Sequence, residues 1–291
     1  MYMSDSSTSE NEDNNSTPME DNTKTFQKRL LKTFGKVRNQ GDYCGGGRLT
    51  DVCNPGLMID GTEEYITFPL LPSQAKLIGE KCSLAPFGRK DETIFDTSIR
   101  HTWQLNPSSF RITNSKWNKF TLNNLKPKIV SHLGLDSSWI KNNLIDLQLY
   151  KLLLYENGSF FKCHRDSEKV NGMFGTLVII LPSCFNGGEF IIKHNNQEQI
   201  FDYSSPKSDH DYHYLVFYAD CQHEILPITN GYRLSLVYNV VINKDKIHLC
   251  SEIPLPISDE ENIQNVCQAL INWSEVRNSP LKLVIPLEHK Y

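Results

Sequence analysis

The chain has 291 residues, of which 39% are hydrophobic and 10% aromatic, and its formal net charge is −4 at pH 7. This length and apolar content suffice for one large domain or two ordinary ones. The slightly acidic balance argues against a general attraction to nucleic acid or to an anionic membrane. No apolar run reaches the length of about 18 residues that a membrane-spanning helix needs.

The N-terminal half is predicted to be a tail followed by a support region. Residues 1–24 are rich in Ser, Asn, Asp and Glu, and so few apolar side chains cannot offset the entropy lost on ordering, so we expect a disordered acidic tail. This composition is unlike a secretory or transit sequence and predicts a cytoplasmic or nuclear location. Residues 25–144 form a mixed, partly helical support region. Within it, Gly45-Gly46-Gly47 lacks the ending of a phosphate-binding loop and is interpreted as a flexible turn.

Two helices and one strand are predicted within this support region. The first helix begins at Ser73, whose hydroxyl is the expected cap, and runs through 74–84. The second covers about 115–133, with Pro127 expected to kink or divide it. Residues 93–105 alternate well enough to be one strand. Arg100 and Trp103 in this strand are interpreted as a surface and core pair, with a substrate groove as the alternative.

From about residue 145 the pattern changes to short apolar runs separated by Asn and Gly turns. We predict strands at 147–155, 160–163, 176–181, 189–193, 198–202, 212–219, 223–227 and 232–242. So many short strands suit a jelly roll, or double-stranded β-helix, at 145–242, with N-terminal helices supporting one sheet. The fold class is therefore α+β, mostly β. The C-terminal extension, 243–291, has no assigned role and is predicted to contain a helix at 258–272 and a strand at 281–286.

His164 and Asp166 form an H-x-D pair at the edge of the second predicted strand, and His223 and Arg233 follow near the end of the strand series. In an extended strand, residues i and i+2 point to the same side, so His164 and Asp166 can reach one ion together. Two imidazoles and a carboxylate on one face of a metal form the facial triad of non-heme Fe(II) oxygenases. The planar guanidinium of Arg233 suits a carboxylate ligand.

Two other interpretations of this motif are weaker. A chance pairing of His and Asp is disfavoured because the pair follows a strand and a glycine turn and meets a second histidine downstream. His164-Arg165-Asp166 with Asn171 also fits the catalytic loop of protein kinases. A kinase needs a glycine-rich loop before this motif and Asp-Phe-Gly after it. The sequence contains neither, so a kinase is rejected.

Several other polar residues are given structural interpretations. The eight cysteines show no C-x-x-C spacing, so neither a zinc ribbon nor a redox pair is predicted. Cys163 and Cys221 are interpreted as backbone neighbours of the site that face away from it. Lys151 and Lys162 are interpreted as solvent-side residues. The cluster of Asp209, His210, Asp211 and His213 is interpreted as a solvated loop rather than a metal site.

The run LYKLLLYENGSFFKCHRD at 149–166 resembles the catalytic domain of 2-oxoglutarate and Fe(II)-dependent dioxygenases, and most of all its prolyl 4-hydroxylase branch. The resemblance continues through 174–182 and 187–190 and ends with FYADCQHEI at 217–225 and GYRLSL at 231–236. It implies that iron is held by His164, Asp166 and His223, and that Arg233 pairs with the distal carboxylate of 2-oxoglutarate.

The same resemblance places Tyr155 and Thr176 beside the cosubstrate, with core packing as the equally weighted alternative for both. It also implies O2 as the second cosubstrate and ascorbate as a candidate reductant. Ile180 stands where oxygen-sensing prolyl hydroxylases have a tyrosine, which argues against that subgroup.

The implied activity is hydroxylation of a protein side chain such as peptidyl proline, with release of succinate and CO2, so a protein or peptide is the expected partner. Nucleic-acid repair dioxygenases share the H-x-D…H…Arg order but carry a second arginine where this chain has Asn239. With the net charge, this departure argues against a nucleic-acid partner, and no membrane partner is predicted. A catalytically silent jelly roll that senses 2-oxoglutarate or oxygen stays open as the alternative. The substrate and oligomeric state are not determined by the sequence.

Overall fold

The computed structural model describes residues 28–33, 42–89, 92–247 and 260–274. The chain divides into a large compact unit, Gln40–Ile257, and a small one formed by Met1–Asn39 with Ser258–Tyr291. In the small unit, helix α6 (Glu260–Ser274) confirms the helix predicted at 258–272. The predicted tail at 1–24 and the predicted strand at 281–286 lie outside the described residues. No helix within the described ranges has the length and apolar character needed to cross a membrane.

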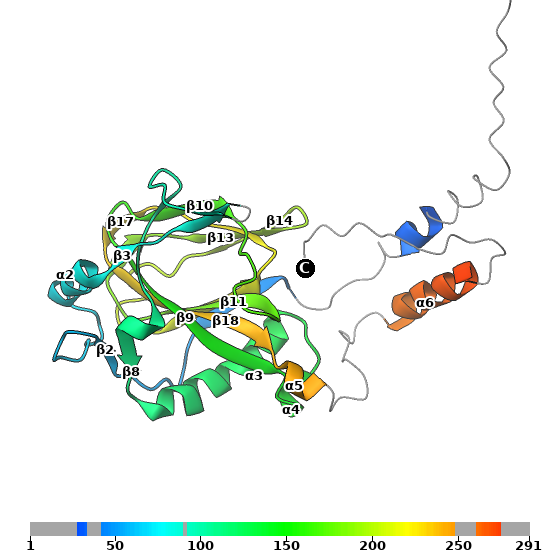
Figure 1. The fold of residues 1–291 in the computed structure, drawn as a ribbon, viewed down its shortest axis with the longest axis horizontal. Helices are drawn as coiled ribbons and strands as arrows, with labels where there is room; N and C mark the ends of the chain where they lie inside the picture. The colour runs from blue at the N-terminus through cyan, green and yellow to red at the C-terminus, as the bar shows by residue number, and fades with distance from the viewer. Residues whose placement is uncertain (1–27, 34–41, 90–91, 248–259, 275–291) are drawn as a thin grey trace, which may run out of the picture. The chain divides into compact units, whose positions relative to one another are not determined.

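The large unit is built on two antiparallel sheets (Figure 1). The seven-stranded sheet has the order β1 (Cys44–Arg48), β15 (His213–Tyr218), β11 (Met173–Ile180), β18 (Arg233–Ile242), β9 (Ile145–Tyr155), β7 (Trp103–Leu105) and β3 (Ser83–Leu84). The five-stranded sheet has the order β14 (Gln197–Phe201), β13 (Phe190–His194), β16 (Gln222–Ile225), β10 (Phe160–His164) and β6 (Arg100–His101). From β9 to β18 the chain crosses repeatedly between the sheets, which gives the double-stranded β-helix that the sequence predicted.

All the strands predicted between 147 and 242 are present, with bounds shifted by a few residues. The sequence prediction missed the pair β12 (Phe185–Gly187) and β17 (Ile228–Gly231). Both contain an Asn-Gly pair, which was interpreted as a turn signal. The remaining short elements of the large unit are β2 (Leu57–Ile59), β4 (Phe87–Arg89), β5 (Glu92–Ile94), β8 (Phe110–Ile112), η1 (Pro107–Ser109), α4 (Ser138–Lys141) and α5 (Lys244–Ile247).

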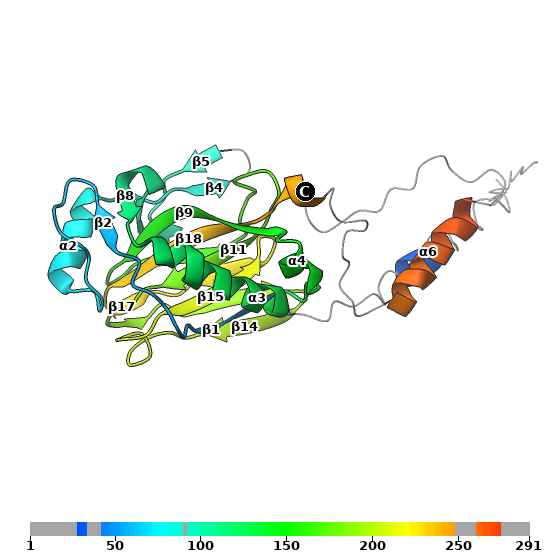
Figure 2. The same ribbon diagram turned by 90° about the horizontal axis from the view of Figure 1, so that it is seen from below.

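Strand alternation divides the apolar side chains between two cores. Along β9, Leu152 and Leu154 face outward and join the core under the helices, whereas Leu153 and Tyr155 face inward and join the core between the sheets. Helix α3 (Asn123–His132) lies along the outer face of the seven-stranded sheet (Figure 2) and buries Leu125, Ile129 and Val130. The inner face is thereby left for the space between the sheets.

The helices begin and end differently from the sequence prediction. Helix α2 (Pro72–Lys81) follows Leu71 and has no side-chain cap, so the predicted cap at Ser73 is wrong. Pro72 occupies the start instead, because its fixed φ suits the first turn and its missing N–H needs no partner there. The region 115–133 is divided, as predicted, into a π-helical segment η2 (Trp117–Leu122) and α3, although Pro127 lies inside α3 rather than at the division.

The single strand predicted at 93–105 is wrong, because the segment is divided into β5, β6 and β7. A turn stops the extended chain at Asp96, whose carboxylate accepts the Ser98 N–H at 2.8 Å and whose carbonyl accepts the Arg100 N–H at 3.0 Å. The chain then enters the five-stranded sheet in β6 and the seven-stranded sheet in β7. This crossing places Arg100 next to the inner space of the jelly roll.

The flexible turn predicted at the triple glycine is wrong, because these glycines lie inside strand β1 and pair with β15. A Cβ on Gly46 would lie 2.5 Å from the Tyr214 carbonyl oxygen, and one on Gly45 would overlap the His132 ring. The glycines are thus required by close packing against β15 and α3 rather than by a turn.

Candidate metal and cosubstrate site

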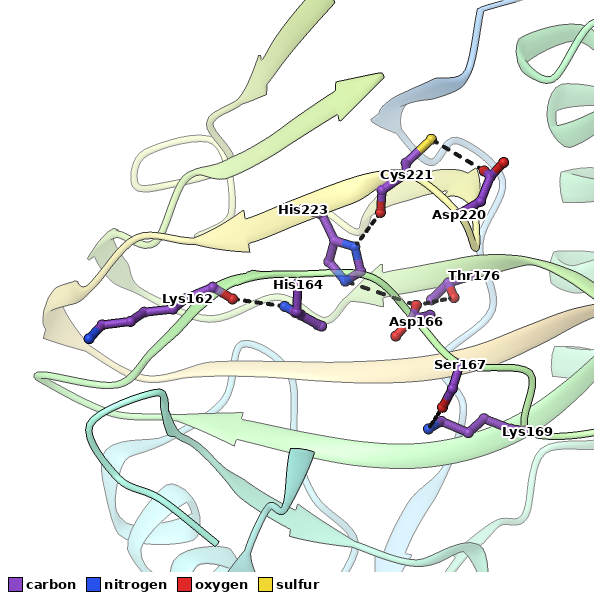
Figure 3. Close-up of polar contacts among 9 residues, drawn as sticks. All are labelled: Lys162, His164, Asp166, Ser167, Lys169, Thr176, Asp220, Cys221 and His223. Atoms are coloured by element: carbon purple, nitrogen blue, oxygen red, sulfur yellow. Dashed lines mark hydrogen bonds and ion pairs between the residues drawn. The ribbon is translucent and has the colours of Figure 1, made fainter. Parts of the chain in front are cut away.

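Three metal-ligand side chains meet where β10 ends in the five-stranded sheet. His164 is the last residue of β10, Asp166 follows it, and His223 lies opposite His164 in the antiparallel pair of β10 and β16. One ligand atom of each lies within 4.8 Å of the other two. Figure 3 shows His164, Asp166 and His223 pointing toward one another. The structure therefore brings together the three residues that the sequence predicted as ligands.

Both histidines are oriented by the backbone in the same way. His164 Nδ1 lies 2.8 Å from the Lys162 carbonyl oxygen, and His223 Nδ1 lies 3.2 Å from the Cys221 carbonyl oxygen. Because a carbonyl oxygen only accepts, each Nδ1 must carry the proton, which leaves each Nε2 with a free lone pair. Histidine ligands of metals commonly donate their other ring N–H in this manner.

The charges of the cluster also favour metal ligation. Burial is the largest effect on the pKa of His164 and, with His223 nearby, holds it well below its ordinary value, so His164 stays neutral. Burial acts to raise the pKa of Asp166, but His223, His164 and a hydrogen bond from Thr176 outweigh it and lower the pKa. The Thr176 hydroxyl donates to Asp166 Oδ2 at 2.6 Å, as Figure 3 shows. A neutral imidazole and an ionised carboxylate are the protonation states in which these groups bind a divalent metal.

Arg233, the first residue of β18, is fully buried. Its Nη1 donates to the Gly188 carbonyl oxygen at 2.5 Å, and its guanidinium lies 4.2 Å from the ring centre of Tyr155 and 4.5 Å from that of Phe190. Burial lowers the pKa of Arg233 to about 10, which leaves it charged at neutral pH. Its Nε and Nη2 have no partner in the described residues. Buried donors without partners are rare and mark a place for an absent acceptor.

Gly188 makes this arrangement of Arg233 feasible. It has a φ of +76°, and a Cβ at this position would lie 2.9 Å from Arg233 Nη1. Any other residue would be strained and would also push the guanidinium away. The Gly187-Gly188 pair of the sequence motif is therefore a packing requirement for Arg233.

A cavity of about 510 Å³ lies between the sheets and is lined by the triad together with Tyr155 and Thr176. Tyr155 is opposite Arg233 in the pairing of β9 with β18, and Thr176 is held against Asp166. Both residues line the cavity while also belonging to the packed interior. Their contact with a cosubstrate stays a prediction.

Two sequence interpretations are wrong at this cavity. Lys151 was interpreted as a solvent-side residue, yet it lines the cavity, because residues 151, 153 and 155 share the inner face of β9. Arg100 was interpreted as a surface residue, yet it is only 9% exposed and also lines the cavity. Lys162 is exposed, as predicted.

Sequence reasoning did not predict two further lining residues, Ser235 and Asn239. They share the inner face of β18 with Arg233 at steps of two, which is the signal that could have identified them. Ser235 Oγ and Asn239 Oδ1 are buried and have no partner among the described residues. They add unused polar groups to the wall of the cavity.

The remaining sequence candidates lie outside the cavity. Cys163 is exposed and Cys221 is buried, and neither lines the cavity, although Cys221 lies within ligand distance of His194 and Asp220. In the predicted solvated loop, Asp211 pairs with Arg48 at 2.9 Å. His213 is instead buried within β15, so that part of the loop prediction is wrong.

Residues 150–241 match the model of the 2OG-Fe(II) oxygenase superfamily, which confirms the resemblance given by the sequence motifs. No curated protein matches the chain. Among solved structures, the chain is similar to a prolyl-4-hydroxylase from Pseudomonas putida at 14% identity, over 74% of this chain and 98% of that one, with a TM-score of 0.41.

Two further solved structures are similar at the same low level. One is a prolyl hydroxylase from Trichoplax adhaerens in complex with a hypoxia inducible factor oxygen degradation domain peptide fragment. The match has 13% identity, covers 82% of this chain and 99% of that one, and has a TM-score of 0.43. The other is a 2OG-Fe(II) oxygenase family oxidoreductase from Burkholderia pseudomallei. The match has 16% identity, covers 58% of this chain and 78% of that one, and has a TM-score of 0.36.

Fe(II) and 2-oxoglutarate are the metal and cosubstrate of the matched superfamily, and the residues present fit both. The two imidazoles with free Nε2 atoms and the ionised Asp166 form a donor set suited to Fe(II). The unpartnered donors of Arg233 suit a carboxylate of 2-oxoglutarate.

Proposed function

We propose that this protein is an Fe(II)- and 2-oxoglutarate-dependent oxygenase that hydroxylates a protein side chain such as peptidyl proline and releases succinate and CO2. The observation that carries the oxygenase is the His164, Asp166 and His223 cluster together with the fully buried Arg233, whose Nε and Nη2 have no partner among the described residues. The resemblance of the motifs at 149–166 and 217–236 to prolyl 4-hydroxylases supports the peptidyl substrate.

Each site residue has a role that follows from its contacts. His164, Asp166 and His223 would hold the iron, and Thr176 keeps Asp166 oriented and ionised through its hydrogen bond. Arg233 would bind the distal carboxylate of 2-oxoglutarate, with Tyr155 flanking the guanidinium. Iron and 2-oxoglutarate together would supply the oxidation that places one oxygen atom on the substrate.

The arrangement of the cavity is consistent with a macromolecular substrate that presents one side chain. The triad lies at the end of β10 and in β16, at the edge of the cavity, with His164 and Asp166 partly exposed. Tyr155 lines the same cavity and is 1% exposed, and the guanidinium of Arg233, a residue with 0% exposure, lies 4.2 Å from the Tyr155 ring centre. A small cosubstrate can therefore fill the inner end while a side chain enters from outside.

The substrate proposal is tested by isotope labelling. Purified protein with Fe(II), 2-oxoglutarate and ascorbate is incubated under oxygen-18 gas with a peptide digest of cellular protein, and peptides that gain one labelled oxygen are sequenced by mass spectrometry. We expect label on proline in peptides treated with the wild type and none with Asp166→Ala. Label confined to another residue type would replace proline in the proposal, and label in no peptide would contradict a peptide substrate.

A further inference from the structure

The lining of the cavity carries positive charge that neither the metal ligands nor Arg233 account for. The described lining residues include the cations Arg100, Lys151 and Lys169, and Asp166 is the only carboxylate among them. Fe(II) and 2-oxoglutarate would add charges of +2 and −2, which cancel. The loaded site would therefore still hold an excess of positive charge, which favours an additional anionic ligand.

Arg100 is held in place as a built part of this lining. Its Nη1 donates to the Pro86 carbonyl oxygen at 2.7 Å, and its guanidinium stacks 4.3 Å from the ring centre of Phe161. Its Nε is buried and has no partner among the described residues, and Arg100 forms no ion pair with a described carboxylate. Burial lowers the pKa of Arg100, while Tyr155 and Asp166 act to raise it.

Lys151 comes from the opposite sheet and faces the same space. Its Nζ donates to Gln104 Oε1 and lies 4.9 Å from the ring centre of Tyr150, and no described carboxylate pairs with it. Burial, followed by repulsion from Arg100 and Lys169, lowers its pKa to about 8. Two cations that repel each other across a partly dry cavity are both stabilised when a carboxylate binds between them.

We propose that Arg100 and Lys151 form a subsite for a carboxylate of the prime substrate, so that the hydroxylated residue lies next to an aspartate or glutamate side chain. This inference rests on the proposed function, because that function assigns Arg233 rather than Arg100 to 2-oxoglutarate. A guanidinium and an ammonium on two walls bind a carboxylate through charge-assisted hydrogen bonds. The subsite would set substrate choice without taking part in the oxidation.

The test compares two pools of fluorescent proline-centred peptides that differ only in having Asp and Glu or Asn and Gln at the flanking positions. Binding is measured by anisotropy with the full chain loaded with Fe(II) and 2-oxoglutarate without oxygen. We expect the wild type to prefer the acidic pool by about tenfold, because one charge-assisted hydrogen bond has that effect on affinity. Equal affinity for the two pools would overturn the subsite.

Variants separate charge recognition from damage to the fold. Lys151→Met keeps the aliphatic stem and should abolish the preference, and Arg100→Gln should do the same. Lys76→Gln, an exposed lysine of α2, is the matched control that retains it. Because Arg100 is buried and its variant could unfold, Lys151→Glu provides a second test, in which the protein must gain a new binding preference. It should make the protein prefer peptides flanked by lysine, and an unchanged preference in this variant would contradict the proposal.

Two further arms identify the source of the carboxylate and separate this inference from the proposed function. The first arm uses N-acetylglutamate as a competitor of the acidic pool. Competition only at far higher concentration supports a peptide as the source of the carboxylate, whereas competition at equal concentration overturns a peptide source. The second arm measures the affinity of Lys151→Met for 2-oxoglutarate. If this affinity falls while the preference for acidic peptides is kept, the subsite belongs to the cosubstrate and the proposal is overturned. A wild type that prefers acidic peptides but forms no succinate would contradict the oxygenase and leave the subsite standing.

Discussion

At the scale of single residues, the metal site depends on hydrogen bonds to its ligands as much as on the ligands themselves. The carbonyl oxygens of Lys162 and Cys221 fix the two imidazoles, and the Thr176 hydroxyl fixes Asp166. Each carbonyl lies two residues before its histidine, whereas Thr176 lies in β11 of the seven-stranded sheet, so the local backbone and the packing of the two sheets orient the ligands before any metal binds.

Thr176→Val removes the hydrogen bond to Asp166 while it keeps the shape of the side chain. The pKa of Asp166 should rise, because a hydrogen bond to its charged form is lost. We expect Mn(II) affinity, measured by calorimetry, to fall by about tenfold, the lower end of the usual effect of such partners. Thr113→Val is the control, since the exposed Thr113 hydroxyl donates only to the Gly56 carbonyl oxygen. Unchanged affinity in Thr176→Val would show that Asp166 does not need this partner.

Arg233→Gln should weaken 2-oxoglutarate binding by roughly a hundredfold, because a buried charge-assisted pair contributes about 2–3 kcal/mol. The measurement is the dissociation constant for 2-oxoglutarate in the presence of Mn(II), with circular dichroism as the check on folding. A folded variant with wild-type affinity would remove Arg233 from the proposed role.

Lys151 predicts a pH dependence of substrate choice. Its folded pKa of about 8 lies below its ordinary value, mainly through burial and then through Arg100 and Lys169, and its Nζ lies 4.9 Å from the Tyr150 ring centre. Lys151 is thus charged below pH 8 and loses its charge as the pH rises through that value. The preference for acidic peptides should therefore decline above about pH 8 in the wild type and show no such decline in Lys151→Met. A preference for acidic peptides that stays constant up to pH 10 in the wild type would contradict the role of the Lys151 charge.

At the scale of elements, the strands could be predicted because their apolar pattern and Asn-Gly turns are local signals. The joining of β1, β3, β6 and β7 to the two sheets could not, because it depends on pairing partners far along the chain. The triple glycine illustrates this limit. Its conformational freedom suggested a turn, whereas close contact with Tyr214 and His132 is what requires it.

Gly46→Ala should therefore destabilise the protein by about 1–3 kcal/mol, the usual cost of forcing a methyl group into a packed site. Its Cβ would meet the Tyr214 carbonyl oxygen of β15 at 2.5 Å. Gly47→Ala in the same strand is the matched control, because its Cβ would lie 3.8 Å from the nearest atom. The free energy of unfolding in urea distinguishes the two, and equal values would mean that β1 tolerates side chains throughout.

At the scale of the whole molecule, the candidate site could be predicted further than the fold around it. His164, Asp166, His223 and Arg233 were predictable because metal and carboxylate chemistry restricts residue type and order. Lys151 and Arg100 were not, because their roles depend on which face of a strand borders the cavity and on a crossing between sheets at residues 100–105. The alternation of inner-face residues from Tyr155 to Lys151 is visible in the sequence, but the cavity that it borders is not.

The central claim is that the two sheets bring these residues together to oxidise 2-oxoglutarate, and succinate release tests it most directly. Purified protein is incubated with Fe(II), 2-oxoglutarate, ascorbate and oxygen, without added substrate, beside His164→Ala. We predict succinate from the wild type and none from His164→Ala, because the variant lacks one metal ligand. Equal succinate from both, or a wild type that binds neither metal nor 2-oxoglutarate, would contradict the account.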